Sequence, residues 1–116
     1  MVNSSKPDVH AFLPLSPQQF HILLALSDGD RHGYGIILDI EERTGGALRL
    51  GTGTLYTAIA RLESLALVAD TGRDDDRRRF YRLTALGRHV LSAETERLEA
   101  LVRYARAKGV SARTKA

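Results

Sequence analysis

A cluster of small and hydroxyl-bearing side chains in residues 54–64 has the residue types and spacing of a surface that binds nucleic acid. At the period of a helix, the side opposite the apolar residues carries Thr57, Ala60 and Ser64. Thr54 and Arg61 lie on one flank and Tyr56 on the other. Small side chains let a helix enter a major groove about 12 Å wide, and hydroxyl and guanidinium groups bind base edges and phosphates. The segment predicts a DNA-reading helix. The alternative is an ordinary solvated helix face, with Tyr56 as an aromatic lid on the core.

The residues just before this segment offer a way to hold a DNA backbone. Gly51-Thr52-Gly53-Thr54 is typical of a turn followed by a helix N-cap. A helix N-terminus presents free backbone N–H groups and the positive end of the helix dipole to a phosphate. Residues 51–54, Thr52 among them, are therefore candidates to anchor a DNA strand without contacting a base.

A basic run, Arg77, Arg78 and Arg79, directly follows Asp74-Asp75-Asp76. Arg residues near a hairpin tip contact phosphates, and the release of counterions makes such binding strongly salt-dependent. The three Asp residues repel a duplex unless they pair with the Arg residues. Phosphate contacts by residues 77–79 and a self-neutralised, solvated loop are both open interpretations.

The sequence has no arrangement typical of a catalytic or metal centre. It contains no cysteine, which excludes disulfides, thiolate metal sites and cysteine nucleophiles. The histidines are scattered without the paired spacing of a metal site: His10, His21, His32 and His89. The glycines of residues 51–53 lack the Lys of a phosphate-binding loop. We therefore expect no enzyme activity, no metal and no cofactor.

Length and charge permit a DNA-binding domain. With 116 residues, the chain can bury one hydrophobic core but not two. The net charge is +3, and most of the 17 basic residues are Arg, which binds phosphate and guanine in a bidentate fork, although a GC-rich genome would give the same bias. No stretch approaches the ~20 apolar residues of a membrane span, and the N-terminus lacks the pattern of a signal peptide. We expect a cytoplasmic protein with no membrane partner.

Two helices are expected before the DNA-reading segment. The first begins at Ser16, where an N-cap, a Pro at the first helical position and a capping-box Gln agree, and it ends at Asp28-Gly29-Asp30. The second runs from about His32 or Gly33 to Thr44, with isoleucines along its apolar side. It ends at Gly45-Gly46, because Gly readily adopts the left-handed conformation of a helix C-terminus.

A short strand over residues 48–50 is expected to lead into the third helix, about 54–65. The apolar side of that helix consists of Leu55, Ala58, Ile59 and Leu62. Two strand-like runs follow, at 67–71 and 79–84. Residues 72–78 between them contain no apolar side chain, which is typical of a hairpin tip in solvent.

The last element is a helix from Thr84 to about Lys108, on the order of 35 Å long at about 1.5 Å per residue. Its apolar side covers roughly 180°, wider than the ~100° needed to cover one core. The excess predicts a twofold homodimer, with contacts from Val90, Leu91, Leu98, Leu101, Val102 and Ala105. A helix wrapped fully by its own domain is the alternative. Glu94 and Arg97, inside the apolar arc, are expected either to pair with each other or to fix the register between subunits.

This order of elements predicts a mainly α, winged helix-turn-helix fold with a C-terminal dimerisation helix. The third helix of such a fold enters the major groove and the hairpin, the wing, touches the flanking backbone. We expect a flexible N-terminal arm over residues 1–14, the winged-helix domain over 15–84, the dimerisation helix over 85–108 and a flexible basic tail over 109–116.

From Leu15 to about Ala105 the chain resembles the PadR family of bacterial transcriptional regulators. The resemblance rests on Leu23-Leu24-Ala25-Leu26, His32-Gly33-Tyr34-Gly35, Gly53-Thr54-Leu55-Tyr56 with Ala58, Arg61, Leu62 and Glu63, and Tyr81-Arg82-Leu83-Thr84 with Gly87-Arg88. Thr57 stands where the family commonly has Pro, and Ala66 where Gly often precedes the wing strand.

The resemblance implies a homodimer of the short-tailed branch, usually a repressor. Such a dimer binds a pseudo-palindromic operator in double-stranded DNA and releases it when a small-molecule effector binds, in some members between the subunits. The resemblance also implies that Tyr34, Thr54, Tyr56 and Arg61 lie at the DNA face. The three-Asp wing tip departs from a simple basic wing.

A second hypothesis is a winged-helix protein-interaction module that does not bind DNA. Substitution of Thr54, Tyr56 and Arg61 separates the two hypotheses. A regulator would lose DNA and keep its dimer, whereas a module would lose only its protein partner.

Overall fold

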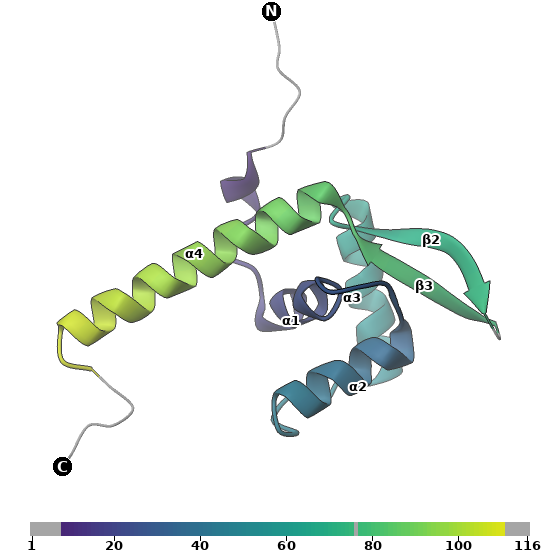
Figure 1. Ribbon diagram of the computed structural model, residues 1–116, viewed down its shortest axis with the longest axis horizontal. Coiled ribbons are helices and arrows are strands. Elements are labelled where there is room, and N and C mark those ends of the chain that lie inside the picture. Colours follow the sequence, from purple (N-terminus) through teal and green to yellow (C-terminus); the bar gives the residue numbers. More distant parts are fainter. Residues whose placement is uncertain (1–7, 76, 111–116) are drawn as a thin grey trace, which may run out of the picture.

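Three helices and a small sheet enclose one hydrophobic core, and a long fourth helix leaves it (Figure 1). The computed structural model describes residues 8–75 and 77–110. Along these residues the elements are η1 (Val9–Phe12), α1 (Pro17–Ala25), β1 (Arg31–His32), α2 (Gly33–Arg43), α3 (Thr52–Ser64), β2 (Val68–Asp75), β3 (Arg78–Leu83) and α4 (Ala85–Ala107). The strands form an antiparallel sheet in the order β1-β3-β2.

Local capping determines where the first helices begin and end. The hydroxyl of Ser16 accepts from the N–H of Gln19, and the Gln19 side chain accepts from the N–H of Ser16, so the predicted capping box is confirmed. His32 caps α2 by accepting the N–H of Gly35 on Nδ1. The helix ends before two residues with left-handed φ angles, +61° at Gly45 and +84° at Gly46, as predicted.

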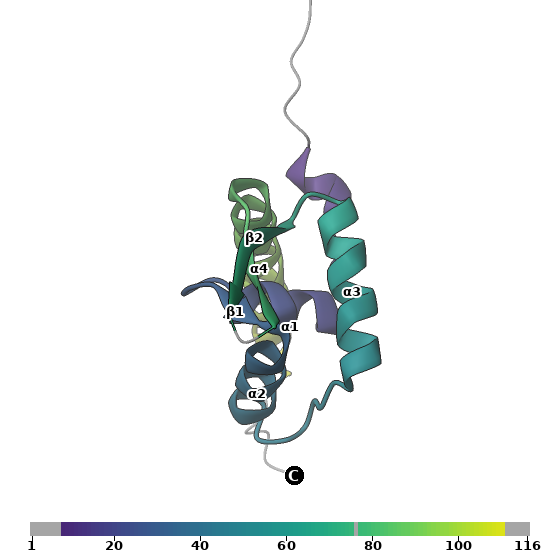
Figure 2. The ribbon, with the colours of Figure 1, turned by 90° about the vertical axis from the view of Figure 1, so that its right-hand side faces the viewer.

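The core lies where α1, α2, α3 and the start of α4 meet the sheet. It includes Ile22 and Leu23 of α1, the predicted Ile36, Ile37 and Ile40 of α2, Leu55, Ile59 and Leu62 of α3, Tyr81 and Leu83 of β3, and Val90 and Leu91 of α4. Each fully buried Leu or Ile contributes about 1.5–3 kcal/mol through burial of apolar surface. This core fixes the orientation of α3, which lies at one side of the domain (Figure 2).

The wing is longer than predicted. Its strands reach Asp75 and Arg78, although residues 72–78 were expected to form a loop because they lack apolar side chains. Backbone pairing can extend a solvated hairpin without burying apolar side chains when oppositely charged residues lie opposite each other on the two strands. In the strand register, Asp75 lies opposite Arg78. The pairing is irregular between Asp70 and Asp74, where Gly72 has a φ of +80°.

Two predictions about the middle of the chain are wrong. Residues 48–50 form no strand, and the free edge of β3 pairs instead with β1. The pattern of Leu48, Arg49 and Leu50, one charged residue between two apolar ones, is too short to specify strand pairing. Leu50 is buried in the core although these residues form no strand. The third helix begins at Thr52 with Gly51 as N-cap, so Thr54 lies in the first turn and is not a cap.

The described part of the expected N-terminal arm is folded. Val9–Phe12 form a short 3-10 helix beside α4, and Val9, Phe12 and Leu13 pack against the core. Three apolar residues without a helical period gave no sequence signal, yet they cover one side of α4. Residues 1–7 of the arm and 111–116 of the expected tail lie outside the described residues.

The fourth helix begins as predicted at Thr84, whose hydroxyl accepts the N–H of Gly87. A side chain on Gly87 would collide with the backbone of Leu67, so α4 packs tightly against the start of the wing. The second half of α4 projects away from the domain (Figure 1). In the described part of the chain, no helix combines the length and the apolar character that crossing a membrane requires.

Candidate nucleic-acid interface

The outward side of α3 is open to solvent. Leu55, Ile59 and Leu62 are at most 1% exposed and hold the inner side of the helix in the core. As a result, the side chains predicted to read DNA are all exposed: Thr54, Thr57, Ala60, Arg61 and Ser64. The Ser64 hydroxyl donates to the carbonyl of Arg61, which leaves its lone pairs available to accept a hydrogen bond. This surface is exposed and rich in small side chains.

The first turn of α3 is also exposed. Thr52 and Thr54 lie inside the helix, and the N-cap, Gly51, has no side chain to accept a hydrogen bond. The free N–H groups of this turn therefore depend on water or on a ligand. A negatively charged group would be favoured here by the helix dipole.

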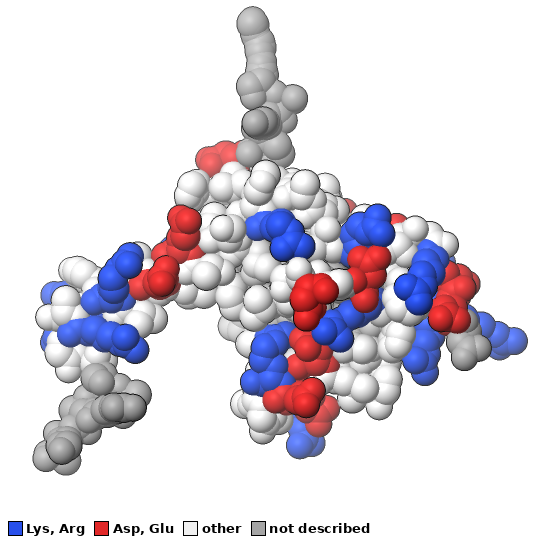
Figure 3. All heavy atoms as spheres, viewed as in Figure 1, with Lys and Arg blue, Asp and Glu red and all other residues white. Residues whose placement is uncertain are grey.

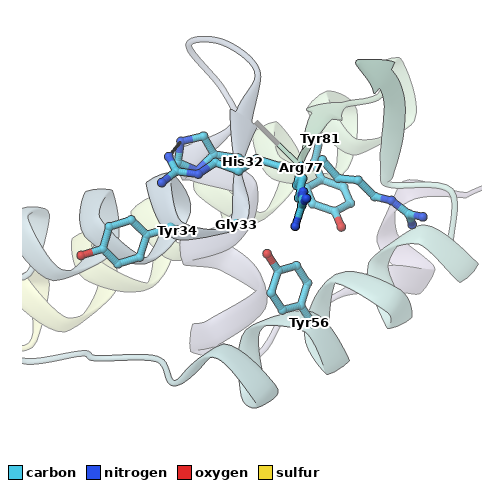
Figure 4. A pocket seen from close by; sticks show the side chains of 8 residues that line it. His32, Gly33, Tyr34, Tyr56, Arg77 and Tyr81 are labelled. Carbon is cyan, nitrogen blue, oxygen red and sulfur yellow. Dashed lines mark hydrogen bonds between the residues drawn. The ribbon is translucent and has the colours of Figure 1, made fainter. Parts of the chain in front are cut away.

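Tyr56 lies between α3 and the N-terminus of α2. Its phenol packs on Gly33, and 47% of its surface remains exposed. It is therefore neither a lid over the core nor a freely rotating surface group. Tyr34, the next residue of α2, is 55% exposed and points away from Tyr56 (Figure 4).

A hollow of about 440 Å³ separates Tyr56 from the wing (Figure 4). It is lined by His32, Gly33, Tyr34, Tyr56, Arg77, Arg78, Arg79 and Tyr81. Burial raises the pKa of Tyr81, with a smaller contribution from the neighbouring Tyr56, so the Tyr81 phenol stays protonated at neutral pH. The structure thus brings the three wing arginines together with Tyr34 and Tyr56, the two tyrosines predicted to lie at the DNA face.

Ion pairs partly neutralise the wing. Arg79 lies 3.7 Å from Asp70, and Arg73 lies 3.7 Å from Asp75 and stacks 3.9 Å over the ring of Phe80. Asp75 is thus paired with Arg73 and not with the basic run 77–79, and the partner of Arg79 is Asp70, outside the three-Asp segment. Asp76 lies outside the described residues, so both interpretations of the wing tip stay open. Arg78 instead faces Nε2 of His32 at 3.0 Å.

The opposite face of the domain shows the same pairing of charges. Figures 1 and 2 place α3 at the back of the view used in Figure 3, where acidic and basic side chains lie side by side. Ion pairs of this kind join Asp39 to Arg43 and Asp30 to Arg82.

Among the described residues, no group of three His, Cys, Asp or Glu side chains could hold a metal ion.

A second hollow, of about 650 Å³, lies between the N-terminus of α1 and the exposed side of α3. Its lining residues are Ser16, Gln18, Gln19, Gly53, Thr54, Thr57, Ala58 and Arg61. The two hollows therefore flank the outward side of α3, one toward the wing and one toward α1.

The residues predicted for dimerisation divide into two groups. Val90 and Leu91 belong to the core of the domain, with 0% and 6% exposure, so the prediction that they face a partner is wrong. The helical period showed how wide the apolar side of α4 is, but not which of its residues the chain's own core would bury. Leu98 and Ala105 are half-buried, and Leu101 and Val102 are about half exposed, at 51% and 48%.

Glu94 and Arg97 pair with each other, which was one of the two predicted roles. Glu94 is 1% exposed, accepts from Arg97 at 2.6 and 2.9 Å, and accepts the N–H of Leu15 at 3.0 Å. The hydrogen bonds from Arg97 lower the pKa of Glu94, against the effect of burial, so it is ionised at neutral pH. The pair fastens α4 to Leu15, the residue before the N-cap of α1.

Sequence reasoning missed His32, Gly33 and Tyr81, which line the first hollow, and Gln18, which lines the second. The segment His32-Gly33-Tyr34-Gly35 was a signal for two of them, but only its Tyr was assigned to the interface. Gln18 carries no signal, because it is one of several polar residues in an exposed first turn.

Comparisons with known proteins agree on one family. The profile of the Transcriptional regulator PadR-like family matches residues 22–93. A transcriptional regulator of Mycobacterium tuberculosis is 33% identical over 87 residues, which cover 73% of this chain and 78% of that protein. An uncharacterized 37.1 kDa transposon protein of Streptomyces fradiae is 42% identical over 83 residues, covering 72% of this chain. The match spans only 23% of that longer protein.

Solved structures show the same fold. A transcriptional regulator from Clostridium thermocellum superposes with a TM-score of 0.69 at 31% identity, over 81% of this chain and 90% of that one. Bacillus subtilis PadR, solved in complex with operator DNA, superposes with a TM-score of 0.61 at 20% identity, over 69% of this chain and 47% of that one. These likenesses confirm the predicted winged helix-turn-helix fold.

Proposed function

Because the chain belongs to the PadR-like family of transcriptional regulators, we propose that it binds a pseudo-palindromic operator in double-stranded DNA as a homodimer. In this proposal α3 enters the major groove and the wing contacts the flanking backbone. The repressor role and release by a small-molecule effector, expected from the resemblance, belong to the same proposal. The matched regulators give no reason to propose an enzyme activity.

The exposed side of α3 carries the proposal. Thr57, Ala60 and Ser64 project outward while the apolar side is locked in the core. A surface without bulky side chains can approach base edges closely, and Thr and Ser hydroxyls donate to and accept from them. Arg61 on the flank has the geometry for guanine or phosphate.

The flanking hollows support contacts to the two backbones of the groove. Arg77, Arg78 and Arg79 border one hollow with Tyr56, and Arg61 borders the other with Thr54. Basic and hydroxyl side chains on both sides of a reading helix fix its register on DNA without specifying sequence. Thr52 and Tyr34 extend these contacts at the N-terminal ends of α3 and α2.

The dimer is proposed from the course of α4. One stripe of this helix contains Gly87, Leu91, Glu94, Leu98 and Ala105, spaced three, four or seven residues apart. In the first half of the helix this stripe covers the core. In its second half the stripe continues beyond the domain, flanked by the exposed Leu101, Val102 and Tyr104. A second copy that packs α4 against this stripe removes apolar surface from water and aligns two reading helices about one helical turn of DNA apart. An effector between the subunits would act by changing that alignment.

Selection of bound sequences from a random duplex library, followed by fluorescence anisotropy, tests the proposal. We expect an inverted-repeat site bound with an affinity at least about a thousandfold above that for unrelated duplex at the same salt concentration. Substituting Thr54, Tyr56 and Arg61 by Ala should abolish this preference and leave the oligomeric state unchanged. Failure to select any sequence would reject the regulator and favour a protein-interaction module.

A further inference from the structure

The ring of His32 makes two contacts that one neutral imidazole cannot satisfy together. Its Nδ1 lies 3.0 Å from the backbone nitrogen of Gly35, and its Nε2 lies 3.0 Å from Nη1 of Arg78. The backbone N–H and the guanidinium can only donate, whereas a neutral imidazole offers one acceptor nitrogen and one N–H. One of the two contacts therefore brings two donors face to face.

The helix cap determines which contact that is. The N–H of Gly35 is fixed in the first turn of α2, where it has no partner within the helix other than the cap. Arg78 is an exposed side chain that can turn and be hydrated. Nδ1 therefore remains the acceptor, and the ring proton lies on Nε2.

The ring is also held neutral. Burial and then the neighbouring Arg78 lower the pKa of His32, with Asp75 acting in the opposite direction. At pH 7 the ring thus has one proton, and it is directed toward Arg78. The edge of the ring packs against Phe80 at 5.3 Å between centroids, which limits its rotation.

Two donors therefore converge on the same place, Nε2–H of His32 and the guanidinium of Arg78. Both border the hollow between Tyr56 and the wing, and its described lining residues include no Asp or Glu. The phenols of Tyr56 and Tyr81 add two further hydroxyls. Such a hollow fits an anion with several acceptor oxygens.

We propose that this hollow binds one phosphodiester group of a DNA backbone and that His32 donates to it through Nε2–H beside Arg78. The proposal rests on the proposed function, because the phosphate comes from the duplex that α3 reads. The bound group would join the N-terminus of α2 to the wing. The neutral His32 adds a hydrogen bond, while Arg78 adds charge and releases a counterion.

His32→Asn tests this role, because Asn retains the N-cap and removes the Nε2–H donor. We expect this variant to unfold at the wild-type denaturant concentration. It should bind a duplex of unrelated sequence at low salt about fivefold more weakly, with an unchanged slope of log affinity against log salt. Arg78→Gln should instead reduce that slope by about one. Wild-type affinity in His32→Asn would overturn the proposal.

NMR of protein labelled with 15N-histidine reads the tautomer directly. We expect His32 to carry its proton on Nε2 in the free protein, and the Nε2–H signal to shift downfield when duplex or inorganic phosphate is added. A proton on Nδ1, or a signal that neither probe moves, would overturn the proposal.

The two proposals fail in different ways. Wild-type protein that binds duplex without sequence preference, with the His32→Asn effect present, contradicts the regulator alone. Sequence-specific binding that His32→Asn leaves unchanged contradicts the phosphate contact alone. If the wild type binds no duplex, a shift of the His32 signal with inorganic phosphate supports the anion site, and its absence rejects it.

Discussion

Tyr56 and Gly33 pack so closely that α2 has no room for a side chain at its first residue. A Cβ atom on Gly33 would lie 2.7 Å from Cζ of Tyr56 and still closer to the phenol oxygen. Gly33 begins α2 and Tyr56 belongs to the first half of α3, so this contact joins the two helices of the helix-turn-helix. It holds the phenol at the edge of the hollow that faces the wing.

Gly33→Ala should therefore weaken DNA binding through Tyr56. The methyl group pushes the half-exposed phenol out toward solvent, and we expect about a tenfold loss of affinity with little loss of stability. Fluorescence anisotropy with the selected operator measures the loss. In a Tyr56→Ala background, Gly33→Ala should have no further effect, because the two residues act through one contact.

Gly35→Ala is the matched control for this prediction. It places the same methyl group in the same helix, where a Cβ would lie 3.4 Å from Cε1 of His32, an ordinary contact distance. Equal losses of affinity in the two glycine variants would show that the Tyr56 contact has no special role.

Ala60→Glu should abolish operator binding without unfolding the protein. Ala60 is exposed in the middle of the outward side of α3, so a carboxylate there costs the fold only a few tenths of a kcal/mol in helix propensity. In the groove it would meet the negative potential of DNA, and we expect at least about a hundredfold weaker binding. Ala47→Glu, an equally exposed alanine in the loop before α3, should bind normally. Normal binding by Ala60→Glu would exclude α3 as the reading helix.

The orientation of α3 could be predicted because the spacing of its apolar residues allows only one side of the helix to face the core. Leu55, Ile59 and Leu62 repeat at helical spacing, so the opposite side had to face solvent. The start of α1 was equally determined, because Ser16 and Gln19 satisfy each other's backbone groups locally. Both features depend on residues within a few positions of each other.

The hollow beside the wing could not be predicted for the opposite reason. His32, Tyr56 and Arg78 lie more than twenty positions apart in the chain and meet only after the helices and the wing have packed. The strand β1 has two residues, too few for any period, and its pairing with β3 depends on the fold. The helical arc of α4 likewise could not show that Val90 and Leu91 would be covered by the chain's own core.

Glu94→Gln should destabilise the domain by about 1–3 kcal/mol, the range for a lost charge-assisted hydrogen bond to a buried group. The amide can still accept the N–H of Leu15, but it gives up the ionic bond to Arg97. Urea unfolding at pH 7 measures the difference. Glu96→Gln, the same change at an exposed position of α4, should have no effect, and equal stability of the two variants would exclude a structural role for the ion pair.

We expect Glu94 to make the free energy of unfolding depend on pH in the acid range. Hydrogen bonds from Arg97 hold the pKa of Glu94 below its ordinary value of 4.5, so the unfolded chain binds a proton more readily. The stabilisation is fully present above about pH 5 and is lost as pH falls through the lower pKa of the folded state. Glu94→Gln should flatten this acid limb of the stability curve.

His21 predicts a second loss of stability, at milder pH. Burial and then Arg43, whose Nη1 lies 2.7 Å from Nδ1, lower the pKa of His21 from 6.5 in the folded protein. The unfolded chain therefore takes up the proton first, and the free energy of unfolding should fall as pH decreases below about 6.5. His21→Asn keeps an acceptor for Arg43 and should show a smaller difference between pH 7.5 and 5.5 in urea unfolding. An identical difference in both proteins would contradict this assignment.

Leu101→Glu should convert the proposed dimer into a folded monomer. Leu101 is 51% exposed on the part of α4 that extends beyond the domain, so a carboxylate there meets water in the monomer and apolar surface in the dimer. Sedimentation equilibrium should give the mass of one chain, circular dichroism should show wild-type helix content, and affinity for the full inverted repeat should fall to that for a single half-site. Ser92→Glu adds the same charge to the opposite side of α4, because nine residues make about two and a half turns. This control should remain dimeric, and a dimer in Leu101→Glu would show that the exposed stripe of α4 is not the interface.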